Sequence, residues 1–285
     1  RRIGDSFKPL FIEAASRIIR RERADVMRAA ERLLGRQDAV GFNDWLEEFY
    51  LAHPTFIERN MLPILMAYGE AVVAEASQEV GVQAGRAENE SELTPELEEF
   101  IRAYQVAYTT RHIGSSLGQL RQIVREAQEK GEDPIVALEK RFGEWEEKRP
   151  DKIANRETVQ AGGAIALAIF IGAGITKVRW HTFGKNCPAC DHLSGKVVGI
   201  MGSFVKKGDA FQPVGLDSPM VARSDIKHPP LHQGCLPGNA YVASCGRVAA
   251  TSERWYDGDM VIIRTAGGHK LACTPNHPVL TASGW

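Results

Sequence analysis

The chain has 285 residues, which is enough for one large domain or for two to three smaller ones. Its hydrophobic content of 44% and charged content of 25% are typical of a folded globular protein, and its net charge of −1 carries no overall signature of nucleic-acid binding. The five cysteines do not indicate a disulfide scaffold, so we expect a reducing, cytoplasmic location.

The sequence contains no predicted membrane span and no predicted signal peptide. Its longest apolar run, Gly162–Ile175, is too short to cross a bilayer and is predicted to be a buried helix. No apolar segment follows the basic pair that opens the chain. The chain starts without Met and stops within a sequence pattern, so both ends are expected to be the ends of a fragment.

From about residue 7 to residue 175 the spacing of apolar residues predicts helices. Thr94-Pro95 and Asp133-Pro134 each combine an N-cap residue with proline at the first helical position, so each is predicted to begin a helix. Pro150 is predicted to break the second of these helices. The acidic stretch 83–92 is expected to be an exposed connection. The first apolar stripe consists of Phe7, Leu10, Phe11, Ala14, Ile18 and Ile19.

Beyond residue 175 the sequence favours strands. Thr176–Thr182 and Gly195–Ile200 are predicted to pair as strands on either side of a CxxC motif. A Gly- and Pro-rich segment covers residues 201–230. Further along, Met260–Arg264 and Lys270–Cys273 are predicted to form a hairpin, because the turn-forming pairs Asp257-Gly258 and Gly267-Gly268 flank the first of them.

These patterns predict an α+β multidomain protein. Residues 1–150 are expected to be a mainly helical N-terminal region, and residues 151–234 a small mixed α/β region with a CxxC hairpin. Residues 235–285 are expected to be all-β, with short strands and turns.

The cysteines and histidines predict a structural zinc site. Cys187 and Cys190 form one close pair and His232 and Cys235 a second, and zinc takes four such N and S ligands in a tetrahedron. The alternative is that the CxxC only makes a tight turn while His232 lies on a polar loop. A redox role is disfavoured because the CxxC is not expected to open a helix after a buried strand. Spare candidate ligands are Asp191, His192 and His228.

Four segments around this motif resemble the phage Mu F-like minor head proteins over about residues 151 to 235. They are Lys152-Ile-Ala-Asn-Arg-Glu157, Lys177-Val-Arg-Trp180, Cys187-Pro-Ala-Cys-Asp-His-Leu-Ser-Gly195 and His228-Pro-Pro-Leu-His232. The resemblance implies a head-morphogenesis region and a non-enzymatic minor capsid component. It would act with portal and capsid proteins in virion assembly, first in the host cytoplasm and then in the virion. Family members often close the motif with Cys-Arg-Cys, and this sequence departs from that pattern directly after Cys235.

At this point of departure a second resemblance begins. Cys235-Leu-Pro-Gly-Asn-Ala-Tyr-Val242 resembles the opening block of inteins and other Hint domains, and Thr274-Pro-Asn-His277 resembles their second block, whose core is T-x-x-H. The order and the spacing of the two blocks both fit. The resemblance therefore implies that residues 235–285 are the N-terminal part of a self-splicing domain.

The resemblance implies a role in splicing chemistry for each of these residues. Cys235 supplies the thiolate that attacks the Gly234–Cys235 amide in an N–S acyl shift, because Cys is the most nucleophilic side chain at neutral pH. His277 protonates the leaving nitrogen, and Thr274 stabilises the oxyanion, with a smaller contribution from Asn276. The reaction needs no cofactor and acts on the chain itself.

Complete splicing also requires a downstream intein segment, in cis or in trans, that ends in His-Asn and is followed by Cys, Ser or Thr. Two other functions stay open from the sequence. One is a Hint-type autoprocessing protein that cleaves itself at Gly234–Cys235. The other is a zinc-binding protein associated with nucleic acid, although nucleic acid is not directly predicted as a partner because the basic residues near the CxxC form only a modest patch. They are Lys185, Lys196, Lys206, Lys207 and Lys227.

Overall fold

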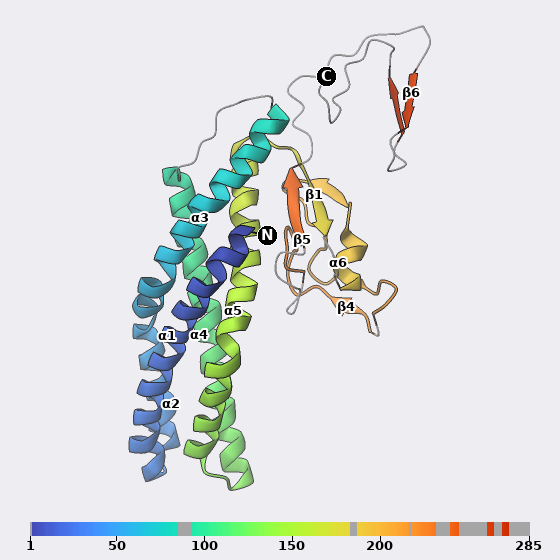
Figure 1. The fold of residues 1–285 in the computed structure, drawn as a ribbon. Coiled ribbons are helices and arrows are strands. Elements are labelled where there is room, and N and C mark those ends of the chain that lie inside the picture. Colours follow the sequence, from blue (N-terminus) through green and yellow to red (C-terminus); the bar gives the residue numbers. More distant parts are fainter. Residues whose placement is uncertain are drawn as a thin grey trace. The chain divides into compact units, whose positions relative to one another are not determined.

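The computed structural model confirms a mainly helical chain with a small antiparallel sheet region (Figure 1). The chain divides into two compact units, residues 1–247 and residues 248–285. The structure describes residues 2–84, 93–182, 187–216, 218–231, 240–244, 261–264 and 270–273.

Long helices make up most of the first unit. Figure 1 shows α1, α3, α4 and α5 alongside one another, and α1 packs along α5 most extensively. The helices are α1 (Arg2–Leu33), the short 3-10 helix η1 (Leu34–Arg36), α2 (Ala39–Ala52), α3 (Pro54–Ala84), α4 (Pro95–Lys130) and α5 (Pro134–Gly172).

Both predicted helix starts are confirmed. The Thr94 side chain accepts a hydrogen bond from the Leu97 amide at the start of α4. The Asp133 carboxylate accepts one from the Ile135 amide at the start of α5. Each side chain thus satisfies one of the amides that a helix N-terminus leaves without an intrahelical partner.

The predicted helix break at Pro150 is wrong, because α5 continues through it. Proline removes one backbone hydrogen bond and crowds the preceding turn, which costs an isolated helix about 3 kcal/mol. Here Pro150 is buried within the bundle, and packing on both sides of it offsets that cost. The boundary predicted at residue 150 therefore falls within a single continuous helix. The predicted buried helix at Gly162–Ile175 is confirmed as far as Gly172, where α5 ends.

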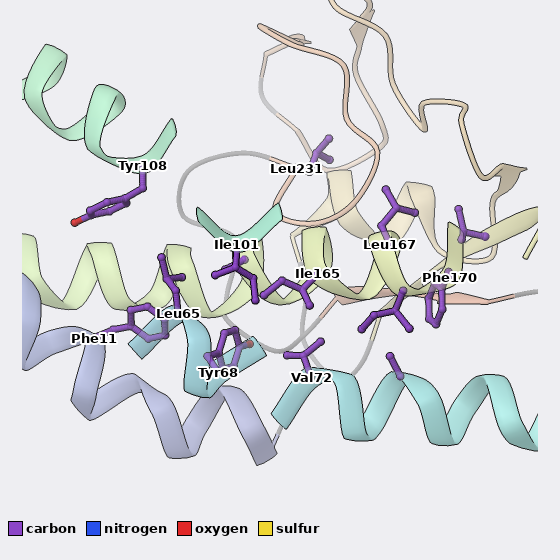
Figure 2. Packing of buried hydrophobic residues seen from close by; sticks show 14 of the residues in the cluster. Phe11, Leu65, Tyr68, Val72, Ile101, Tyr108, Ile165, Leu167, Phe170 and Leu231 are labelled. Carbon is purple, nitrogen blue, oxygen red and sulfur yellow. The ribbon is translucent and has the colours of Figure 1, made fainter. Parts of the chain in front are cut away.

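Two apolar clusters fill the interior of the first unit. The sheet-side cluster joins α1, α3, α4 and α5 to the small sheet, and Figure 2 shows part of it, with ten residues labelled. The distal cluster lies at the α2 end of the bundle and includes Phe42, Leu46 and Phe142. Of the predicted α1 stripe, Leu10 is an exception, since 44% of it is exposed. The labelled residues of Figure 2 are Phe11, Leu65, Tyr68, Val72, Ile101, Tyr108, Ile165, Leu167, Phe170 and Leu231.

The predicted strand pair is confirmed as the core of a three-stranded antiparallel sheet. β1 (Lys177–Thr182) lies in the middle, between β2 (Val197–Gly199) and β5 (Ala240–Ser244). Gly174, with a φ of 72°, makes the left-handed turn that joins α5 to β1. The helix α6 (Pro188–Leu193) follows β1.

Trp180 anchors this sheet to the helices. Its side chain is fully buried in the sheet-side cluster, and its ring meets that of Phe204 edge to face at 5.2 Å between centroids. Short strands β3 (Ala210–Phe211) and β4 (Met220–Val221) pair within the predicted Gly- and Pro-rich segment.

The second unit contains the predicted hairpin. β6 (Val261–Arg264) pairs antiparallel with β7 (Lys270–Cys273), so that Val261 lies opposite Cys273. The predicted turns on either side of β6 lie outside the described residues, as does most of the predicted connection 83–92. Among the described helices, none combines the length and the apolar character that a bilayer span requires.

Candidate functional site

The CxxC motif opens a short helix. Cys187 is the N-cap of α6, and its Sγ accepts a hydrogen bond from the Cys190 amide at 3.4 Å. Cys187 is half-buried and Cys190 is buried. The expectation that the motif would not open a helix after a strand is therefore wrong. Pro188 at the first helical position, preceded by an N-cap thiol, is the local signal for this helix.

Cysteine sulfur is a common zinc ligand, so Cys187 and Cys190 could supply two of the four ligands of a tetrahedral site. The other two predicted ligands, His232 and Cys235, lie outside the described residues. Within the described part, no three His, Cys, Asp or Glu side chains gather in a way that would hold a metal. The structure thus shows one half of the predicted ligand set.

The spare ligand His228 has a different role in the fold. Its Nδ1 lies 2.7 Å from the Pro229 carbonyl oxygen, to which it donates a hydrogen bond, and burial lowers the pKa of its imidazole. The ring packs against Gly163 of α5, where an added Cβ would lie 2.8 Å from Nδ1. His228 therefore docks the segment before the predicted splice junction onto the bundle. The other spare ligands, Asp191 and His192, are exposed on α6.

The predicted splicing residues also lie outside the described part of the chain. These are Gly234, Cys235, Thr274, Asn276 and His277. The structure does describe one strand that follows the first block and one that precedes the second block. β5 begins five residues after Cys235, and β7 ends directly before Thr274.

A buried polar layer, which the sequence analysis missed, separates the two apolar clusters. Glu22 is fully buried on α1, and its Oε1 lies 2.8 Å from His112 Nε2 of α4 and 3.8 Å from His53 Nε2. The signal was present in the sequence. Glu22 falls on the apolar stripe of α1 between Ile18 and Val26, at four-residue spacing.

Electrostatics keep this layer charged at Glu22 and neutral at His53. Burial by itself would raise the pKa of the Glu22 carboxyl, but the attraction and hydrogen bond of His112, together with Arg149, lower it below its ordinary value. Burial lowers the pKa of His53, against the opposing effect of Glu22. Burial and the nearby Glu22 carboxylate raise the pKa of Tyr50.

A large cleft of about 2270 Å³ runs between α4, α5 and the segment that carries β3 and β4. Of the described residues that line it, four are acidic, among them buried Glu157, whose carboxylate accepts a hydrogen bond from Tyr104 Oη at 2.6 Å. Burial raises the pKa of Glu157 in spite of Tyr104 and Arg111. Eight basic residues also line the cleft, namely Arg111, Arg141, Lys148, Arg149, Lys152, Arg156, Arg223 and Lys227.

No family model, curated protein or solved structure matches this chain.

Proposed function

We propose that residues 1–234 form a phage minor head protein of the Mu F-like kind and that residues 235–285 begin a self-splicing element within it. One observation carries this proposal: two splicing blocks occur in the correct order, and the first begins where the head-protein motif is interrupted at Cys235. The β6–β7 hairpin between the blocks supports it, because splicing elements are built from short strands. The head protein would act with portal and capsid proteins during virion assembly.

The proposed first step is an N–S acyl shift. The Cys235 thiolate attacks the Gly234 carbonyl carbon, and a C–S bond forms as the C–N bond to Cys235 breaks. The leaving nitrogen takes up a proton delivered by His277, so the thiol proton is lost as the amine proton is gained. Thr274 stabilises the oxyanion of the tetrahedral intermediate. The thioester at Gly234 is then open to the next nucleophile.

A thiol-cleavage experiment tests this step. The 285-residue chain incubated with dithiothreitol should release a fragment of residues 1–234, and a second fragment that starts at Cys235, both identified by their masses. Cys235→Ala should abolish the release, and His277→Ala should slow it by roughly a hundredfold or more. Cleavage that persists in Cys235→Ala, or a complete lack of cleavage in the unchanged chain, would contradict the proposal.

The same cysteine links splicing to a proposed zinc site. Zinc would be held by Cys187, Cys190, His232 and Cys235, where it would supply a structural clamp for the sheet region. Metal bound to Cys235 would occupy the nucleophile and inhibit cleavage. Cleavage is therefore measured at increasing zinc concentrations in the unchanged chain and in Cys187→Ser. Inhibition that is lost in the variant supports the shared ligand, and unchanged cleavage under saturating zinc excludes it.

The basic lining of the cleft favours a second candidate function, namely association with nucleic acid. Its eight basic and four acidic residues contrast with the net charge of −1 for the whole chain. A phosphate backbone seated there would bind with a strong salt dependence. Lys148→Glu and Lys152→Glu should weaken binding to duplex DNA and reduce its salt slope, whereas Lys130→Glu, at the end of α4, should not. Equal effects of all three variants would rule out the cleft as the binding surface.

A further inference from the structure

The central strand β1 uses its two edges for different partners. The Trp180 amide donates to the Lys196 carbonyl at 2.9 Å, and the Gly195 amide donates to the Trp180 carbonyl at 2.8 Å. The backbone groups of Trp180 therefore face the β2 side. Because these groups alternate along an antiparallel strand, those of Arg179 and His181 face β5. Arg179 lies opposite Ala243, and His181 lies opposite Tyr241.

The partner on the second edge comes from beyond the proposed splice junction. β5 starts at Ala240, five residues after Cys235, yet its backbone completes the sheet of the head-protein region. The first compact unit accordingly extends to Arg247 and does not end at Gly234. The first strand of the proposed splicing element is thus paired with the host sheet.

The chain ahead of the junction is anchored to the same body. Leu231 is buried in the sheet-side cluster that also contains Trp180, and His228 packs against Gly163 of α5. Only eight residues, 232–239, connect Leu231 to β5. Because Leu231 and Ala240 are both held by the first unit, the pairing of β5 with β1 limits how far the two described ends of this connection can separate.

We propose that β1 is a positioning element for the splice junction. This role rests on the proposed splicing function. Its edge at Arg179 and His181 holds Ala240–Ser244 in register, while the host core holds Leu231. The occupant of this edge is the first strand of the splicing element in the same chain. In the sheet order β2-β1-β5, β5 is an edge strand that pairs with β1 alone among the described residues.

Removal of a single backbone hydrogen-bond donor tests the proposal. His181→Pro removes the amide that faces β5, and proline favours extended backbone at the preceding residue, which keeps Trp180 in its strand conformation. His181→Ala removes the same side chain but keeps the amide, so it is the matched control. Both variants are made in the full 285-residue chain. The rate of Cys235-dependent cleavage is then measured over a range of dithiothreitol concentrations.

The proline variant should show a plateau cleavage rate roughly tenfold or more below that of the alanine variant. The dithiothreitol concentration at half-maximal rate should not rise, because that concentration reports access of the external thiol. Hydrogen exchange should show loss of protection at Arg179, with protection kept at Trp180 and in α5. A general loss of folding would expose all of these amides together.

The outcomes distinguish the positioning role of β1 from the splicing function. Cys235-dependent cleavage at equal plateau rates in the proline and alanine variants overturns the positioning role and leaves the splicing function standing. Faster cleavage in the proline variant overturns it as well, because β1 would then restrain the junction. A lack of Cys235-dependent cleavage in the unchanged chain removes the splicing function and the positioning role with it.

Discussion

The helical bundle is stabilised by its own residues, whereas the small sheet depends on residues from other parts of the chain. The bundle is built from helices whose own sequences carry the caps, the apolar stripes and the buried polar layer. The sheet has few residues, and one of its three strands is supplied from beyond the proposed junction. Its largest buried side chain, Trp180, packs into a cluster made mostly of helix residues.

The difference shows a one-way dependence between the two regions. The distal cluster lies entirely within α1, η1, α2, α4 and α5, so the helices have a core that includes no sheet residue. The described sheet residues form no separate core and share the sheet-side cluster with the bundle. We therefore expect the bundle to tolerate damage to the sheet, and the sheet to fail when the bundle is damaged.

Truncation of Trp180 should have the largest effect. Trp180→Ala removes a fully buried ring and should lower the free energy of unfolding of the sheet by about 3–5 kcal/mol. Hydrogen exchange should accelerate in β1 and β2 while α1 and α4 keep their protection. Phe142→Ala, in the distal cluster, is the counterpart and should destabilise both regions. Equal loss of protection in both variants would show that the two regions unfold as one.

Removal of the charge at Glu22 should come next. Glu22→Gln keeps the shape of the side chain but leaves His112 without its carboxylate partner, which should cost about 3 kcal/mol. Glu31→Gln, on the exposed side of the same helix, should change stability by less than about 0.5 kcal/mol. The free energies come from urea denaturation followed by the helical signal. A neutral result for Glu22→Gln would mean that the charged contact between Glu22 and His112 does not stabilise the bundle.

The contact between the bundle and the His228 segment can be probed with two glycines of α5. Gly163→Ala places a Cβ against the His228 ring and should destabilise the protein by about 2 kcal/mol. Gly143→Ala has open space around it in the same helix and should instead stabilise by about 1 kcal/mol. Thermal unfolding of both variants measures the difference. If both variants change the stability in the same direction, the His228 ring moves aside without a measurable loss of stability.

The smallest expected effect is a pH dependence from the polar layer. His53 has a lowered pKa in the folded protein, so the unfolded chain binds a proton first as the pH falls. Stability should therefore be full above about pH 6.5 and decline below it, by at most about 1.4 kcal/mol per pH unit. Because the pKa of Glu22 is lowered in the folded protein, the stabilising contribution of its charge is lost only at more acidic pH. Denaturation at pH 5.5, 6.5 and 7.5 should show the decline, and His53→Gln should flatten it.

The sequence predicted those features whose cause is local. The starts of α4 and α5 follow from Thr94-Pro95 and Asp133-Pro134, and the pairing of β1 with β2 follows from two short β-rich runs around the CxxC. The β6–β7 hairpin follows from its flanking turn residues. In each case the residues that determine the structure are neighbours in the chain.

The features that the sequence did not predict depend on distant partners. Pro150 breaks an isolated helix, but the packing of α1 against α5 offsets its cost, and no local pattern reports that packing. Glu22 and His112 are 90 residues apart, so each alone resembles an ordinary charged residue on a helix. The pairing of β1 with β5 joins segments on opposite sides of the proposed junction, where a domain boundary was predicted. Of the predicted site, only Cys187 and Cys190 lie within the described residues.

The length of α5 has a consequence for insertions and deletions. Its 39 residues extend over about 58 Å, with Arg149 near the polar layer and Gly162 and Gly163 under Tyr68 and His228. One residue inserted between these points would rotate the glycines by about 100° relative to the layer, whereas four residues would rotate them by only about 40°. The packing at its two ends thus fixes the rotation of one end of α5 relative to the other about the helix axis. Natural variation in the length of α5 should therefore occur in whole turns.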